Sequence, residues 1–136
     1  MLFGCGQAKK ETADYKAVRD EVMQFHDVVM GDHGVIVQNE MKLDTLLKTL
    51  KLRKQKSPEL DTVKERRDIE AMIASLVKAD EAMNDWMHKF EPDVEGKSNE
   101  EAVRYFKSEK TKIAAIDSIY KQEIKQSNGY LKKSKL

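Results

Sequence analysis

The chain has 136 residues, of which 36% are charged and 40% are apolar, and this balance suits one domain of long helices that each bury one face. Its formal net charge is +1, so no overall attraction to nucleic acid is expected. The single cysteine excludes an internal disulfide and a zinc site of several cysteines, and no run approaches the roughly 20 apolar residues that cross a bilayer.

Residues 1–12 are predicted to form a truncated lipobox followed by a polar tether. Leu2-Phe3-Gly4-Cys5 resembles a bacterial lipobox, in which a leucine and a small residue precede a cysteine that becomes lipid-modified. The basic and apolar leader of such precursors is missing here, so this interpretation expects it to be encoded upstream of Met1. Cys5 is then the lipidation site. The alternative is an ordinary cytoplasmic N-terminus with a free thiol.

A helical bundle domain is predicted over residues 13–131, and its first helix carries one stripe of mostly apolar residues at alternating spacings of three and four. The stripe consists of Tyr15, Val18, Val22, Phe25, Val29, Asp32, Ile36, Asn39, Leu43, Leu46 and Leu50. Asp32 and Asn39 are its polar members, and such residues often set the register between helices at a cost in stability. Gly31 and Gly34 each cost about 1 kcal/mol relative to alanine inside a helix, so a kink or break is expected there.

The second helix is predicted from Pro58 to Phe90, because proline is favoured at the first helical position and Glu91-Pro92 ends the helix. Its stripe has the a/d spacing of a coiled-coil heptad. It consists of Ile69, Met72, Leu76, Ala79, Met83, Trp86 and Phe90. The largest apolar groups are expected to anchor the core. These anchors are Met83, Trp86, Phe90 and Phe106.

The third helix is predicted to begin at the capping box Ser98-Asn99-Glu100-Glu101, with Ser98 as the cap. Its stripe consists of Ala102, Phe106, Ile113, Ile116, Tyr120, Ile124 and Leu131. Asn128-Gly129 is expected to loosen the end of this helix, and residues 132–136 are predicted to form a disordered basic tail.

Three amphipathic helices of similar length joined by short loops predict an all-α fold, an elongated antiparallel three-helix bundle. A four-helix bundle is the alternative if the first helix breaks at Gly31 to Gly34. Either bundle is stabilised chiefly by burial of the stripes, since helix propensity contributes little by comparison. The oligomeric state stays open, because stripe residues can be buried inside one bundle or across a dimer.

A second stripe on the first helix combines thioethers and imidazoles, namely Met23, His26, Met30 and His33. The second helix adds Met83, Met87 and His88. These groups are ligands that copper(I) accepts, and imidazole also suits zinc, so a metal site is conceivable. The favoured alternative is that the methionines widen the buried face, because methionine commonly fills gaps in helical cores.

If the chain reverses near Lys56 and near Glu95, antiparallel packing predicts that His33, Asp80 and Glu109 lie at about the same height along the bundle. Three interpretations stay open. The carboxylates pair with lysine or arginine at the surface, they form a buried polar layer that fixes register, or they hold a cation or perform acid–base chemistry with His33. Surface pairing is favoured, and the Glu-x-x-His pairs typical of di-iron bundles are absent.

Several segments together resemble small Bacteroidota envelope lipoproteins labelled "viral A-type inclusion protein"-like. The matching segments are Phe25-His26-Asp27-Val28-Val29-Met30, Ala79-Asp80-Glu81-Ala82-Met83-Asn84-Asp85-Trp86-Met87, and Tyr105-Phe106 with Glu109-Lys110 and Ile113. Gly31 stands where these relatives often have proline. The resemblance implies a lipid-anchored helical protein of the outer membrane that faces the periplasm, and it carries no assigned activity. No acidic run follows Cys5, which favours the inner leaflet over the cell surface.

These observations favour a non-enzymatic, lipid-anchored envelope protein whose helical surface binds an unknown protein partner. No catalytic residue or cofactor is predicted, since a Gly-rich phosphate loop, a Ser-His-Asp set and an HExxH motif are all missing from the sequence. Two alternatives stay open, namely a copper- or zinc-binding lipoprotein that uses the Met/His stripe and an enzyme that uses the Asp/Glu/His layer. A cytoplasmic location is the alternative if no signal peptide precedes the chain.

Overall fold

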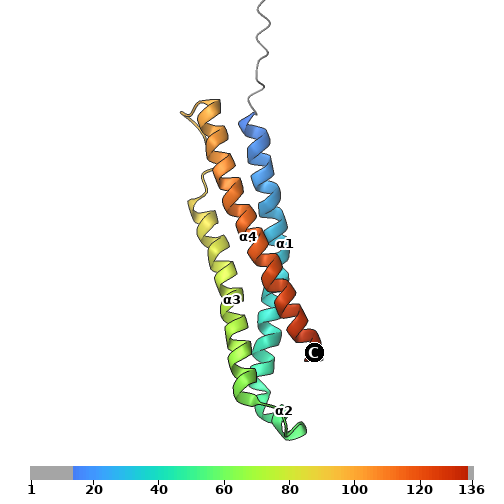
Figure 1. The fold of residues 1–136 in the computed structure, drawn as a ribbon. Helices are drawn as coiled ribbons and strands as arrows, with labels where there is room; N and C mark the ends of the chain where they lie inside the picture. Colours follow the sequence, from blue (N-terminus) through green and yellow to red (C-terminus); the bar gives the residue numbers. More distant parts are fainter. Residues whose placement is uncertain (1–13, 135–136) are drawn as a thin grey trace, which may run out of the picture.

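The computed structural model describes residues 14–134, which form four packed α-helices and no strand (Figure 1). In chain order the helices are α1 Tyr15–Lys48, α2 Leu50–Lys56, α3 Thr62–Lys89 and α4 Asn99–Lys133. The prediction of an all-α fold is confirmed. Three of these helices are long, and α2 is a short segment at one end of the bundle. The predicted tether and Cys5 lie outside the described residues.

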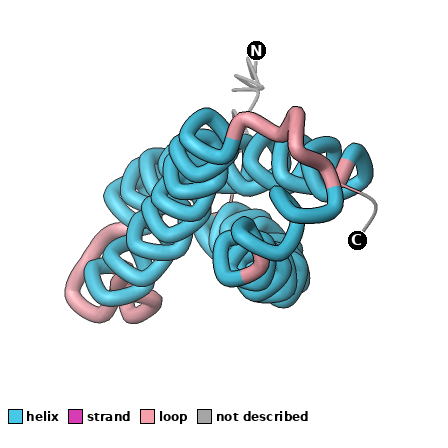
Figure 2. The backbone as a smooth tube through the Cα atoms, turned by 90° about the horizontal axis from the view of Figure 1, so that it is seen from below, coloured by secondary structure: helices cyan, strands magenta, loops and turns pink. Residues whose placement is uncertain are grey.

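The long helices lie along one another, and their contacts give their directions. Hydrogen bonds between α1 and α4 join residues 84 to 89 positions apart, from Tyr15 with Asn99 to Asn39 with Asn128, so these two helices run parallel. α3 runs antiparallel to both, as Figure 1 shows. Seen from below in Figure 2, the long helices are arranged as a triangle around a common interior.

α1 runs without interruption through Gly31 and Gly34, so the break that would create the four-helix alternative is not present there. Val29 and Ile36 lie on either side of the glycines, and both side chains are fully buried. Their burial outweighs the roughly 2 kcal/mol that two glycines cost a helix, because each buried side chain contributes about 1.5–3 kcal/mol.

The interruption occurs instead at Thr49, which separates α1 from the short helix α2. Thr49 leaves the helical conformation with φ −101° and ψ 7°. Its hydroxyl donates to the carbonyl oxygen of Thr45 at 2.8 Å. Threonine hydroxyls that bond back to the preceding turn compete with regular helix geometry. The Thr49 hydroxyl also lies 3.4 Å from the carbonyl oxygen of Leu46, whereas Thr45, within α1, bonds only to Met41.

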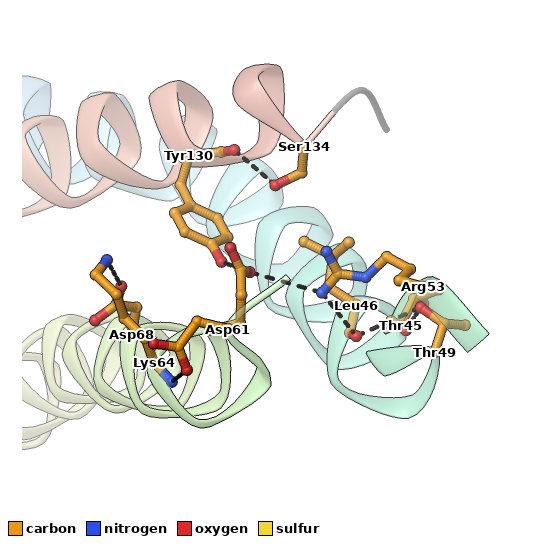
Figure 3. A network of polar contacts seen from close by, with 10 residues as sticks. Thr45, Leu46, Thr49, Arg53, Asp61, Lys64, Asp68, Tyr130 and Ser134 are labelled. Atoms are coloured by element: carbon orange, nitrogen blue, oxygen red, sulfur yellow. Dashed lines mark hydrogen bonds and ion pairs between the residues drawn. The ribbon is translucent and has the colours of Figure 1, made fainter. Parts of the chain in front are cut away.

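α3 begins at Thr62, four residues later than the predicted start at Pro58. Asp61 is the cap, and its carboxylate accepts from the backbone N–H of Lys64 at 3.1 Å (Figure 3). The preceding Ser57–Leu60 segment forms a turn closed by Leu60 N to Ser57 O at 2.9 Å. An aspartate cap is a stronger start signal than proline alone, which explains the shift. The end at Lys89, with Phe90 as the C-cap, agrees with the sequence to within one residue.

α4 begins as predicted, with the Ser98 hydroxyl accepting from the N–H of Glu101 at 3.2 Å. The helix does not loosen at Asn128-Gly129 but continues to Lys133, so part of the predicted basic tail is helical. Leu131 is only 5% exposed, and its burial holds the last turns against the bundle.

The core consists of the three predicted stripes, whose members are all buried or half-buried. Of the expected anchors, Phe106, Met83 and Trp86 are buried, whereas Phe90 is half-buried. The Phe90 ring stacks on the indole of Trp86 with centroids 4.7 Å apart, and it lies 6.1 Å from the ring of Phe106. Aromatic side chains therefore pack together where the end of α3 meets the first turns of α4.

Replacing Trp86 by alanine should lower the free energy of unfolding by about 3–5 kcal/mol, because the substitution removes a buried ring and leaves a cavity. Urea unfolding followed by circular dichroism at the helix band measures this loss. Met41→Ala is the matched control, since Met41 is 66% exposed and its loss should change stability by less than about 0.5 kcal/mol. Equal effects of the two substitutions would contradict the central place of the indole.

Candidate functional site

A polar layer joins the three long helices at one carboxylate oxygen. Asp80 Oδ1, from α3, lies 2.9 Å from His33 Nδ1 of α1 and 2.6 Å from the hydroxyl of Tyr120 of α4. An ionised carboxylate only accepts, so Nδ1 of the imidazole and the phenol both donate. The layer thus fixes the tautomer of His33 and links all three helices through Asp80.

Glu40 lies near this polar layer and adds a second carboxylate. Burial raises the pKa of Glu40 above its usual 4.5, and the charge of Asp80 raises it further, whereas His33 lowers it. Its Oε1 atom is buried and has no hydrogen-bond partner among the described residues. Burial also raises the pKa of Tyr120, and its hydrogen bond to Asp80 adds to the effect, so the phenol stays a neutral donor.

The chemistry of the layer is that of a structural cross-link. A carboxylate that orients an imidazole is also a component of acid–base sites, but here its Oδ1 atom is occupied by both donors. Residues 14–134 contain no group of three or more histidine, cysteine or acidic side chains placed to hold a metal ion. Of the three interpretations of these residues, the geometry fits a polar layer that fixes register. The layer is only half-buried, because the side chains of Asp80 and His33 are 19% and 43% exposed.

Glu109 does not join His33 and Asp80, so this part of the predicted constellation is wrong. Its Oε2 atom accepts from the indole N–H of Trp86 at 2.8 Å, and its Oε1 atom lies 3.0 Å from Lys112 Nζ. The side chain is only 7% exposed and belongs to a layer nearer the N-terminal end of α4. Its satisfied hydrogen bonds explain why a carboxylate is tolerated on the stripe.

Tyr120 takes the place predicted for Glu109, and sequence reasoning treated it only as an apolar member of the stripe. The signal that could have identified it is chemical, since a phenol buried on a helix stripe needs a hydrogen-bond partner. Tyr120 is 1% exposed, and its partner is Asp80, which lies next to Ala79 of the α3 stripe.

A second polar layer joins α1 to α4 further along the bundle. The side-chain amide of Asn39 donates to Ser127 Oγ at 2.8 Å and to Asn128 Oδ1 at 2.9 Å. Asn39 and Ser127 are 3% and 0% exposed. The register role proposed for Asn39 fits this geometry, and the bond to Asn128 is the physical reason why α4 stays regular there.

The Met/His stripe is divided between the surface of α1 and its contact with α3, because His26 and His33 are half-buried and lie against Trp86 and Asp80 of α3. Met23 and Met30 are 37% and 40% exposed. His26 Nδ1 lies 3.0 Å from Asp27 Oδ1, and His33 is held by Asp80, so the two imidazoles already have carboxylate partners. On α3, Met83 is buried and Met87 packs against the core, while His88 Nδ1 lies 2.9 Å from the carbonyl oxygen of Asn84.

Replacing Tyr120 by phenylalanine should reduce the free energy of unfolding by about 1–2 kcal/mol, because a donor to a half-buried carboxylate is lost while the ring is kept. Chemical unfolding measures the change. Tyr15→Phe is the control, since no hydrogen bond of its hydroxyl is recorded among residues 14–134, and its effect should be near zero. A Tyr120→Phe variant as stable as the parent would refute the role of Tyr120 as a cross-link.

Replacing Glu40 by glutamine should stabilise the protein at neutral pH, by up to about 1 kcal/mol at this partly exposed site. The folded-state pKa of Glu40 lies above the unfolded value of 4.5, so its ionised form costs stability above the folded pKa. The advantage of the variant should disappear as pH falls through the folded pKa towards values below 4.5. Unfolding curves at neutral pH and below pH 4.5 measure the difference in stability between the variant and the parent. Glu81→Gln, at an exposed position, is the control. An advantage that persists in acid would refute this assignment.

Comparison of the chain with protein-family models, with curated proteins and with solved structures gives no match. No family is therefore assigned, and the resemblance to Bacteroidota envelope lipoproteins stays a prediction. Within residues 14–134, none of the helices combines the length and apolar character that a bilayer-spanning segment needs. The function has to be argued from the interior and the surface of the bundle.

Proposed function

We propose that the protein is a non-enzymatic, lipid-anchored envelope protein, an elongated three-helix rod that binds a helix of another protein on the outer side of α1. Lipid attachment at Cys5 and a periplasm-facing place in the outer membrane belong to this proposal, and the lipobox-like segment Leu2 to Cys5 supports them. The interior supports a binding rather than a catalytic role, because Asn39, Glu109 and Asp80 all form hydrogen bonds that link one helix to another.

One observation carries the binding proposal, namely an apolar line on the outer side of α1. Met23, Met30 and Val37 recur every seven residues, which is close to two helical turns, and Met41 follows one turn later. These four side chains are 37%, 40%, 37% and 66% exposed. The line extends for about 27 Å, given a rise of 1.5 Å per residue. This is the spacing with which one helix receives another along an apolar seam.

Gly34 lies on the same line, between Met30 and Val37. A Cβ atom added at Gly34 or at Gly31 would meet no atom within 4 Å, so packing inside the chain gives no reason for either glycine. Each costs about 1 kcal/mol relative to alanine in a helix. A glycine flanked by exposed apolar side chains lets the backbone of another helix approach closely, and this supplies the missing reason.

A photo-crosslinking residue at Val37 in the native envelope tests the proposal. We expect one reproducible protein adduct, and we expect it to be lost when Met30→Asp is added, because burying an unpaired carboxylate in the seam is unfavourable. The same crosslinker at Ser118, which is exposed on α4, is the control and should not give this adduct.

The same adduct from Ser118, or adducts at Val37 that survive Met30→Asp, would refute binding on this line. Circular dichroism of the Met30→Asp variant should remain that of the parent, since Met30 is exposed and makes no core contact. Loss of helix content in that variant would count against the exposed placement of the line.

A further inference from the structure

The end of the bundle that carries α2 is strongly basic. This basic tip, residues 45–68 and 130–134, contains ten lysines and arginines and four acidic residues, a net charge of +6. The other described residues, 14–44 and 69–129, contain twelve basic and nineteen acidic residues, a net charge of −7. The net charge of +1 therefore conceals a separation of charge along the rod, because α2 and the start of α1 lie at opposite ends (Figure 1).

The basic tip holds a cleft of about 430 Å³ between α2, the start of α3 and the end of α4. Clefts of roughly 300–1,000 Å³ are the usual size for small ligands. The lining combines three cations with hydroxyl groups and one carboxylate. The polar lining residues are Arg53, Lys56, Ser57, Glu65, Tyr130, Lys133 and Ser134.

Arg53 is held in place on one side of this cleft, as Figure 3 shows. Its Nη2 atom donates to the carbonyl oxygen of Leu46 at 3.3 Å and lies 3.7 Å from Glu65 Oε2. The phenol of Tyr130 donates to the same carboxylate oxygen. Burial raises the pKa of Tyr130, and its bond to Glu65 adds to this, so the phenol remains a donor. The one carboxylate of the cleft is thus already occupied.

The cationic side chains of the cleft have few hydrogen-bond and ion-pair partners among the described residues. Arg53 Nε has no hydrogen-bond partner among the described residues. Lys56 and Lys133 are exposed, and neither forms an ion pair within residues 14–134. Three cations and one carboxylate leave a local surplus of two positive charges. This surplus matches a phosphate group, which carries about −1.5 to −2 at neutral pH.

We propose that the cleft of the basic tip, lined by Arg53, Lys56 and Lys133, binds a phosphate group, either free phosphate or the phosphomonoester of a lipid headgroup. Arg53 offers oriented donors, while the two lysines supply point charges at the mouth of the cleft. Ser57 also lines the cleft, so its hydroxyl could add a neutral hydrogen bond. The proposal is independent of the apolar line on α1 and of the lipid anchor.

Titration of the full chain with inorganic phosphate, followed by amide NMR shifts, tests the inference. We expect saturable shifts around Ser57 and Ser134 at up to about 10 mM phosphate, within the weak range that a single exposed group allows. The Lys56→Gln/Lys133→Gln double variant should bind about tenfold more weakly, because it loses both mobile cations. The matched control is Lys16→Gln/Lys107→Gln, two exposed lysines away from the tip, and it should bind like the parent.

Three results would overturn the proposal: no saturable shift at the tip, equal affinity in the double variant and its control, or identical shifts from sodium chloride at matched ionic strength. Vesicles of phosphatidylcholine with and without phosphatidic acid distinguish the two sources of phosphate. Binding to phosphatidic acid vesicles that the double variant loses assigns a lipid headgroup, whereas shifts with inorganic phosphate and no vesicle binding assign a free small molecule.

Discussion

Burial of one face on each long helix is the constraint on which the rest of the structure depends, but burial alone does not define the structure. The stripes repeat every seven residues, so sliding one helix by two turns places apolar side chains opposite apolar side chains again. Three polar side chains, each bonded across a helix interface, remove this ambiguity. Asp80 binds His33 and Tyr120, Asn39 binds Ser127 and Asn128, and Glu109 binds Trp86. Each contact has its partner at only one register, and a slip would leave buried polar groups unpaired, which costs about 1–3 kcal/mol per group.

The sequence was sufficient to predict which face of each helix is buried, because periodicity reports direction around a helix axis. It was not sufficient to predict height along the bundle. Placing Glu109 beside Asp80 assumed a tight reversal near residue 95. In the structure α4 begins at Asn99 and extends beyond the end of α3 (Figure 1), which moves Tyr120 opposite Asp80. The non-helical connection from Phe90 to Ser98 sets this offset, and no helix pattern encodes its length in space.

The missed boundaries have a similar cause. Thr49 and Asp61 act through single side-chain hydrogen bonds, to Thr45 O and from Lys64 N, which compete locally with proline and glycine signals. At Gly31 and Gly34 the helix continues although glycine disfavours it. Val29 and Ile36 are buried on both sides, and their packing outweighs the low helix propensity of glycine.

The continuity of α1 also determines where the two proposed binding surfaces lie. A helix of 34 residues is about 51 Å long at 1.5 Å per residue, so the two ends of the rod are held well apart. The apolar line from Met23 to Met41 follows the middle of this helix, and the basic tip with Arg53 lies beyond its end. A kink at Gly31 would have interrupted the line and changed the direction of the tip. Because the core holds the helix straight there, the glycines are free to serve the outer surface, and the two proposed binding surfaces keep a fixed distance from each other.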